Sequence, residues 1–487
     1  MMWATARHNR VTTTAAVGFI AVAFAISRAW AYAMGVRFDA TPLGWYWQFI
    51  DPVLLRDRLF ESLYYSHTQP PLFNLFLGLN LKLFPSSFST AMHVEYMVLG
   101  LTTAIALYVL LTELGLSAVV SALLATAFAV CPATLVYENW LFYEYPTMAA
   151  LVIAAAALPR FLARDSVPAG VTFFAAAAAA IYIRTVFQLV WLLAVIGALL
   201  LVKRPRLVIK CCVVPLALVV LLYAKNLMLV GAPLTSSWFG MHLTRPTLSQ
   251  ISMKTRQELV AAGSLHSISL VEPFSYVDSY KGYVPLAPPT GIPVLDLPAK
   301  SGGSQNFNAM TYVAVARAYF WEAWWIIRNR PDVYRASVTE AIVLYLSPST
   351  DYAFVDANRV KISEYDRFFA KHVYYRTEYL RRIGLGILGA YLFALAYGVA
   401  LLGKLGWQRR KPTPAEFTII FLAVTTLYAS ALSCLTEVGE NQRQRFFLDP
   451  LVLAVVAAGL RGLAMWIGGL TRHVGRAINR PARIATA

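Results

Sequence analysis

Polar side chains are crowded into one short stretch of a chain that is otherwise very apolar. Asp51–Asn74 reads DPVLLRDRLFESLYYSHTQPPLFN, with three carboxylates, a histidine and a Pro70-Pro71 pair. Carboxylates and histidines are the side chains that most often move protons in enzymes. A plain membrane anchor does not need them. The stretch therefore predicts a rigid polar loop that works on a lipid-linked substrate at the membrane face.

Acids and arginines also occur in three other short polar stretches. Glu138 and Glu144 flank an aromatic turn, Arg184 stands between two apolar runs, and Glu440–Asp449 reads ENQRQRFFLD. A carboxylate can take the proton from a hydroxyl group, and the planar fork of an arginine fits the oxygens of a departing phosphate. The combination predicts transfer of a group from a phosphate to a hydroxyl.

The candidate residues follow from this chemistry. Asp39 and Asp51 are the candidates for the general base. The candidates for substrate contact are Arg37, His67, Gln69, Glu138, Glu144, Arg184, Glu440, Asn441, Arg443 and Arg445, the last two as phosphate ligands. A helix cap, a salt bridge or simple packing is the alternative role for each. No cofactor follows with certainty from the sequence, and the oxygens of Asp39, Asp51 and Glu138 could hold a divalent cation.

The elements that position these residues must be membrane helices. The chain has 487 residues, of which 58% are hydrophobic and 14% charged, and its mean hydropathy is +0.57. A soluble protein carries about 25% charged residues. Apolar runs long enough to cross a bilayer recur, without the alternation of a membrane barrel. The sequence predicts an all-α polytopic membrane protein.

Basic residues fall in the short gaps between the apolar runs, and this gives each span its direction. Lys and Arg are in excess in cytoplasmic loops, so the net charge of +17 reflects topology and not binding to nucleic acid. The basic clusters are Arg7 and Arg10; Arg160 and Arg164; Lys203, Arg204, Arg206 and Lys210; Lys404, Arg409, Arg410 and Lys411; and Arg472, Arg476, Arg480 and Arg483. About ten spans are predicted, with both ends inside: 11–35, 91–112, 116–133, 144–160, 168–183, 186–202, 208–230, 383–403, 415–434 and 447–468.

The spans divide the chain into three parts. Residues 1–230 form an N-terminal membrane module with helices 1–7 and a first outer loop, 36–90. Residues 231–382 form a large mixed outer segment with interfacial helices, and 383–487 a C-terminal module with a basic cytoplasmic tail. Residues 70–86 must begin and end outside, so they are predicted to form an interfacial helix on the outer face.

Three segments resemble the GT-C superfamily of polyprenyl-phosphate-sugar-dependent glycosyltransferases, particularly bacterial relatives of the dolichyl-phosphate-mannose protein O-mannosyltransferases. They are RFDA (Arg37–Ala40), HTQPPLFNLFLGLNLKLF (His67–Phe84) and ENQRQRFFLDPL (Glu440–Leu451). They resemble the start of the family's first outer loop, its His-Pro-Pro-Leu segment and its late Arg-rich loop. A second acid usually follows the loop-one acid of that family, whereas Ala40 follows Asp39 here. Asp39 matches by its distance from the first helix, and Asp51 lies nearer His67, so both stay open.

The resemblance implies an inverting transferase in the cytoplasmic membrane with its site on the periplasmic or outer side. The donor would be a sugar on a polyprenyl phosphate, the acceptor a hydroxyl of a glycan, lipid or protein, and the base an aspartate. A transporter or flippase of a lipid-linked glycan is the alternative, but it would place charges deep inside several helices or break helices at mid-membrane. The identities of the sugar and the acceptor do not follow from the sequence.

Overall fold

The computed structural model describes residues 2–376 and 382–478, with side chains from residue 13 to residue 468 outside that gap. Within these residues the chain is helical, with isolated bridges but no strand. The predicted all-α membrane class is confirmed. Arg480 and Arg483 of the predicted basic tail lie outside the described residues.

Seven helices of the described chain are long and apolar enough to cross a bilayer. They are α1 (Met2–Ala33), α6 (Phe88–Glu113), α9 (Glu144–Arg164), α12 (Pro205–Val230), α20 (Leu385–Gln408), α21 (Pro414–Thr436) and α23 (Asp449–Ile478). The pair α7 (Ala118–Val130) and α8 (Pro132–Glu138) makes an eighth if its 55° bend is counted as one span. Helices α10 (Val167–Ile183) and α11 (Leu189–Val202) are apolar but shorter. These helices coincide with the predicted spans, while the count of ten remains a prediction.

Helix α9 is the centre of the membrane bundle. It packs against α6, α10 and α21, and most of its side chains are buried. Its sequence is rich in alanine, and small residues let neighbouring helices approach closely. Because Glu144 is the first residue of α9, the most tightly packed helix of the bundle fixes the position of this carboxylate.

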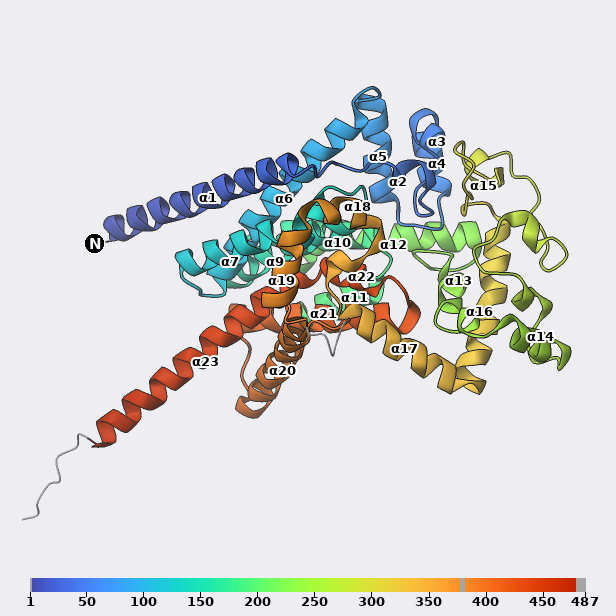
Figure 1. The fold of residues 1–487 in the computed structure, drawn as a ribbon. Coiled ribbons are helices and arrows are strands. Elements are labelled where there is room, and N and C mark those ends of the chain that lie inside the picture. Colours follow the sequence, from blue (N-terminus) through green and yellow to red (C-terminus); the bar gives the residue numbers. More distant parts are fainter. Residues whose placement is uncertain (1, 377–381, 479–487) are drawn as a thin grey trace, which may run out of the picture.

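The arrangement of the helices separates two ends of the molecule. The N-terminal end of α1 and the far end of α23 lie on one side, and α13 (Phe239–Thr244), α14 (Met253–Ala261) and α16 (Thr311–Asn329) lie on the opposite side (Figure 1). The helices of the first loop lie at that opposite end as well. They are α2 (Pro42–Trp45), α3 (Pro52–Asp57), α4 (Leu59–Tyr65) and α5 (Pro71–Leu83), and α4 contacts α15 (Pro293–Asp296).

The predicted interfacial segment 70–86 is occupied by the helix α5. Pro71 is its first residue, where a missing N–H does no harm, and the helix ends at Leu83, shortly before Pro85. The helix is therefore confirmed, and its orientation on the bilayer surface stays a prediction.

The outer segment builds a hydrophobic core of its own. This core contains Trp238, Met241, Phe274, Phe307 and Tyr312, all buried. Helix α17 (Pro331–Tyr345) follows α16 after a break at Pro331 and packs instead on α21 and on the short α22 (Asn441–Phe446). The outer segment is thus anchored on the bundle through α17, next to the Arg-rich loop.

Candidate functional site

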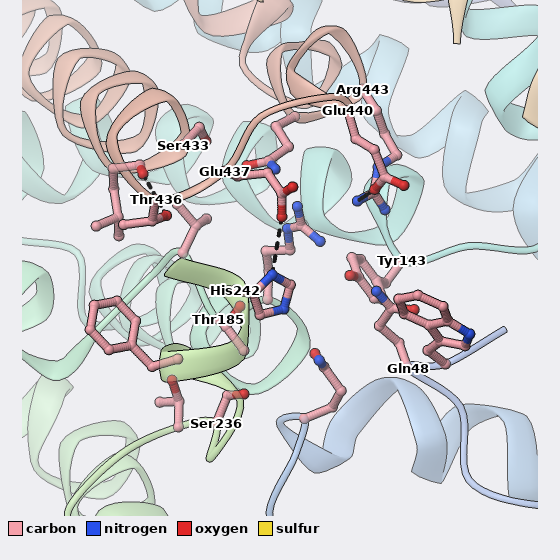
Figure 2. Close-up of a pocket in the computed structure, with 18 of the residues that line it drawn as sticks. Gln48, Tyr143, Thr185, Ser236, His242, Ser433, Thr436, Glu437, Glu440 and Arg443 are labelled. Atoms are coloured by element: carbon pink, nitrogen blue, oxygen red, sulfur yellow. Dashed lines mark hydrogen bonds and ion pairs between the residues drawn. The ribbon is translucent and has the colours of Figure 1, made fainter. Parts of the chain in front are cut away.

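A cavity of about 530 Å³ opens where the first loop, the outer segment and the ends of the membrane helices meet. Its walls come from seven separate stretches of the sequence. The lining residues are Trp45, Tyr46, Trp47, Gln48, Gln69, Tyr143, Arg184, Thr185, Val186, Gln188, Leu234, Thr235, Ser236, Phe239, His242, Arg245, Phe354, Leu432, Ser433, Thr436, Glu437, Glu440, Arg443 and Gln444. Figure 2 shows many of these side chains around the space that they enclose.

Two buried arginines share one carboxylate in this cavity. Arg443 Nη1 lies 3.0 Å and Arg184 Nη1 3.4 Å from Glu144 Oε1, and the three side chains are 3%, 7% and 0% exposed. Arg443 Nη2 also donates to Glu440 Oε2 at 2.6 Å. The Arg184 guanidinium lies 4.6 Å from the ring centroid of Tyr143. Aromatic faces and the shared acid thus hold both guanidinium groups in place.

These arginines keep N–H groups that no described residue uses. Nε of Arg184 and Nε of Arg443 are buried without a hydrogen-bond acceptor, and the oxygens of Glu144 receive no hydrogen bond of good geometry. A buried polar group left unpaired costs about 1–3 kcal/mol, and more when it is charged. The guanidinium groups have the chemistry to bind an anion with several oxygens from the cavity side.

A second ionic cluster lies across the cavity. Glu437 Oε2 lies 3.0 Å from His242 Nδ1, and Arg245 Nη1 donates to Glu437 Oε1 at 2.6 Å. Arg245 Nη1 is also 4.0 Å from Glu440, which links this cluster to Arg443. Burial works against the charged form of Glu437, but Arg245 and the hydrogen bond with His242 lower the pKa of its carboxyl. These partners favour the carboxylate form of Glu437.

Gly240 determines where His242 lies. The short helix α13 packs so closely on α16 that a Cβ at Gly240 would lie 1.8 Å from the carbonyl oxygen of Ala316. No side chain fits there, so the helix can approach only with glycine at this position. His242, two residues further, thereby reaches Glu437.

We expect Gly240→Ala to push α13 away from α16 and to destabilise the protein by about 1–3 kcal/mol, as overpacking does. Thermal unfolding of the detergent-solubilised protein measures the loss. Gly44→Ala is the matched control, because a Cβ at Gly44 meets no atom within 4 Å. Equal melting temperatures for the two variants would contradict this account of α13.

Four of the sequence candidates line the cavity, and two others lie beside it. Gln69, Arg184, Glu440 and Arg443 line it, and Glu144 contacts both arginines from behind. Asn441 donates from Nδ2 to the carbonyls of Ser433 and Glu437, and so shapes the loop that carries Glu437. The structure thus brings together two of the predicted arginines, Arg184 and Arg443, with two of the predicted acids, Glu144 and Glu440.

Arg445 faces away from the cavity. Its Nη1 donates to Asp449 at 2.8 Å, and its Nη2 donates to Ser349 Oγ at 2.7 Å. Since Ser349 follows α17, this buried arginine ties the outer segment to α22. Its position fits anchoring, and Arg443 alone of the two predicted phosphate ligands reaches the cavity.

Asp39 and Asp51 do not line the cavity. Asp39 Oδ1 accepts hydrogen bonds from Thr41 N at 2.9 Å and Thr41 Oγ1 at 2.6 Å. Asp51 caps α3 by accepting from Val53 N, and it accepts from Ser301 N and Oγ, both at 2.7 Å. These contacts fit the alternative role of both carboxylates, which is to cap or hold local structure. Their role as the base stays a prediction.

Arg37 and Glu138 are also engaged elsewhere. Arg37 Nη1 donates to the carbonyls of Tyr32 and Val36 at the end of α1. Glu138 is fully buried, where Arg28 Nη2 donates to it at 2.7 Å and the Tyr145 hydroxyl at 2.6 Å. No group of three or more His, Cys, Asp or Glu side chains suited to a metal occurs among the described residues. A divalent cation at Asp39, Asp51 and Glu138 stays a prediction.

His67 connects the first loop to the outer segment through hydrogen bonds. The ring is fully buried, with Nδ1 2.7 Å from Ser237 Oγ and Nε2 2.8 Å from the carbonyl oxygen of Asn308. A carbonyl oxygen only accepts, so Nε2 carries the proton and Nδ1 accepts from the serine. Burial lowers the pKa of His67 to about 4. The structure thus favours a packing role over substrate contact.

The neutral state of His67 makes stability depend on pH. Between pH 6.5, the ordinary pKa, and pH 4 the unfolded chain binds a proton that the folded chain does not, so stability falls as the pH falls. The full effect is about 3 kcal/mol. We expect His67→Gln, whose amide can donate to Asn308, to show a flatter stability profile across this window. Chemical unfolding at several pH values checks it, and parallel profiles would contradict it.

Several cavity residues were not predicted as site residues. They are Trp45, Tyr46, Gln48, Tyr143, Gln188, His242, Arg245 and Glu437. The signal that could have found His242 and Arg245 is weak: a histidine and an arginine three apart in a stretch rich in Gly, Pro, Ser and Thr. Glu437 belonged to a loop already singled out for its acids.

Comparisons with known proteins give little further guidance. No family model matches this chain, and no curated protein matches it. The chain is similar to a solved structure of the archaeal oligosaccharyltransferase AglB from Archaeoglobus fulgidus, in complex with an inhibitory peptide and a dolichol-phosphate, at 13% identity and a TM-score of 0.34. The similarity covers 96% of this chain and 52% of AglB, so this chain spans about half the length of that protein. A likeness of this size carries no argument about activity.

Proposed function

We propose that this chain is a membrane glycosyltransferase of the GT-C type. It moves a sugar from a polyprenyl phosphate to an acceptor hydroxyl at the outer face of the cytoplasmic membrane, with inversion. One observation carries the proposal: Arg184 and Arg443 are buried in a cavity at the ends of membrane helices, with N–H groups that have no acceptor. The resemblance of the three sequence segments to the GT-C transferases supports the same reading.

A phosphate group suits these two arginines. The donor is a phosphodiester with one negative charge, and the departing polyprenyl phosphate carries up to two. Groups that meet the charge as it develops stabilise the transition state more than the ground state. Arg443 and Arg184 are already fixed by Glu144 and by aromatic rings, so they need not reorganise when the bond breaks.

The remaining wall suits a sugar. Trp45, Tyr46 and Phe354 give it apolar faces, and Trp45 is still 39% exposed. Gln48, Gln69, Gln188, Thr235 and Ser236 add hydrogen-bonding groups around the same space. Aromatic faces combined with polar groups that converge on one space are typical of a site for a small organic ligand. An aspartate base, Asp39 or Asp51, remains the prediction from the sequence, but neither lines the cavity and both accept hydrogen bonds from neighbouring residues.

The test uses the purified full chain in nanodiscs with a panel of undecaprenyl-phosphate-linked hexoses and pentoses. A membrane fraction from a strain without the protein serves as acceptor. We expect release of undecaprenyl phosphate from at least one donor and incorporation of its sugar. Binding of undecaprenyl phosphate without consumption of any donor, together with movement of the donor across proteoliposomes, would favour the transporter instead.

A further inference from the structure

We propose that His242, backed by Glu437, takes the proton from the acceptor hydroxyl. This inference rests on the proposed function, and it replaces an aspartate base by an imidazole that already lines the cavity. His242 comes from α13 of the outer segment and Glu437 from the loop after α21, and Figure 2 shows the two side chains pointing toward each other. The His242 side chain is 29% exposed, whereas that of Glu437 is 7% exposed.

The contact with Glu437 fixes which ring nitrogen is free. Because the Glu437 carboxylate can only accept a hydrogen bond, the proton of a neutral His242 ring lies on Nδ1, 3.0 Å from Oε2. Nε2 then holds the free electron pair. No described residue hydrogen-bonds to Nε2. An imidazole that is oriented by a buried carboxylate and open on its other side has the arrangement of a general base.

Arg245 also binds Glu437, so His242 is not the only partner of this carboxylate. Its Nη1 donates to the second oxygen of Glu437 at 2.6 Å, so the negative charge of this acid is shared between two partners. The other charged groups of the cavity are Glu440, Arg443 and Arg184, with Glu144 behind them. The three acids balance the three arginines in number, so a proton taken up by His242 would add one positive charge to this cluster, next to the carboxylate of Glu437.

The other acids are less suited to take the proton. The carboxylate of Glu440 is engaged by Arg443 at 2.6 Å. Asp39 and Asp51 lie outside the cavity lining and accept hydrogen bonds from Thr41 and from Val53 and Ser301. His242 therefore combines access to the cavity with an unused electron pair.

The step balances without a further reactant. The hydroxyl proton moves to Nε2 of His242, and the electron pair of the hydroxyl oxygen forms the bond to the anomeric carbon. The bond from that carbon to the phosphate oxygen breaks, and its electron pair leaves on polyprenyl phosphate. The imidazolium gives its proton to water once the products have left.

His242→Ala and His242→Gln test the inference in nanodiscs, with the donor that the wild-type protein consumes. We expect the maximal transfer rate to fall about 100- to 10,000-fold, while binding of undecaprenyl phosphate changes less than about threefold. Added imidazole should restore part of the rate of His242→Ala and none of that of His242→Gln. His266→Ala is the matched control, because this second histidine of the outer segment is 86% exposed and does not line the cavity.

Glu437→Gln provides a second variant in case the histidine variants fold poorly. It keeps the shape of the side chain but removes the charge that supports an imidazolium, so we expect a loss of at least tenfold without rescue by imidazole. Wild-type rates in His242→Gln and Glu437→Gln would overturn the role of His242 and leave the transferase standing. A wild-type protein that neither binds undecaprenyl phosphate nor consumes a donor would overturn the transferase itself.

Discussion

Replacing Arg443 by alanine should lower sugar transfer by about 100- to 1,000-fold, the usual effect of removing one donor from a charge-stabilising site. The Arg443 side chain is 3% exposed, and its Nε has no acceptor among the described residues. The maximal rate should fall more than the affinity for the donor, because the phosphate gains charge only as the bond breaks. Release of undecaprenyl phosphate at saturating donor measures the rate.

Stability must be separated from chemistry in this variant. Loss of Arg443 leaves Glu144 with Arg184 as its single cationic partner, and an uncompensated buried charge costs several kcal/mol. Arg443→Gln keeps hydrogen-bonding groups beside Glu144, whose charge Arg184 still meets, so it should unfold closer to the wild type than Arg443→Ala, yet remain inactive. Arg56→Ala, at an exposed ion pair of the first loop, is the control. A folded Arg443→Gln variant with wild-type transfer would remove Arg443 from the site.

Replacing Arg28 by alanine should have the largest effect on stability, a loss of about 3–5 kcal/mol. Arg28 lies in the membrane helix α1, and its Nε and Nη2 donate to Glu138 at 2.9 and 2.7 Å. Glu138 is wholly buried, so without its partner it would be a lone charge among apolar helices. The melting temperature of the detergent-solubilised protein should fall, and so should the yield of folded protein from membranes.

The double variant Arg28→Met with Glu138→Gln distinguishes two causes of instability in Arg28→Ala: the unpaired charge of Glu138 and the lost packing of the Arg28 side chain. It removes both charges at similar volume and should recover most of the stability, as substitutions of buried ion pairs often do. Tyr145 can still donate its hydroxyl hydrogen to the glutamine oxygen. If the double variant is as unstable as Arg28→Ala, the shape of Arg28 matters more than its charge.

The membrane helices could be predicted because a bilayer demands long apolar runs, and the basic gaps then give direction. The same reasoning placed α5, since Pro70, Pro71 and Pro85 limit where a helix can begin and end. Gln69, Arg184, Glu440 and Arg443 could be predicted as neighbours for a related reason. Short loops at one end of a bundle leave few places for their side chains.

The direction of single polar side chains could not be predicted in this way. The direction of a carboxylate in a loop depends on single hydrogen bonds, such as those of Asp39 with Thr41 and of Asp51 with Ser301. The place of His242 depends on contacts between distant segments, among them Gly240 with Ala316. Such contacts leave no periodic pattern in the sequence. Hydropathy therefore identified the end of the molecule where the loops meet, but not every side chain that lines the cavity there.

The separate core of the outer segment bears on how such a protein could diversify. The arginine pair stands on the membrane bundle, whereas His242 stands on α13, whose neighbours Trp238 and Met241 belong to the second core. Substitutions that reshape one core need not loosen the other. Under the proposed function, related proteins could therefore keep the site for the lipid phosphate while the acceptor changes. This requires that Gly240 and His67 are retained, because they hold α13 and the first loop in place.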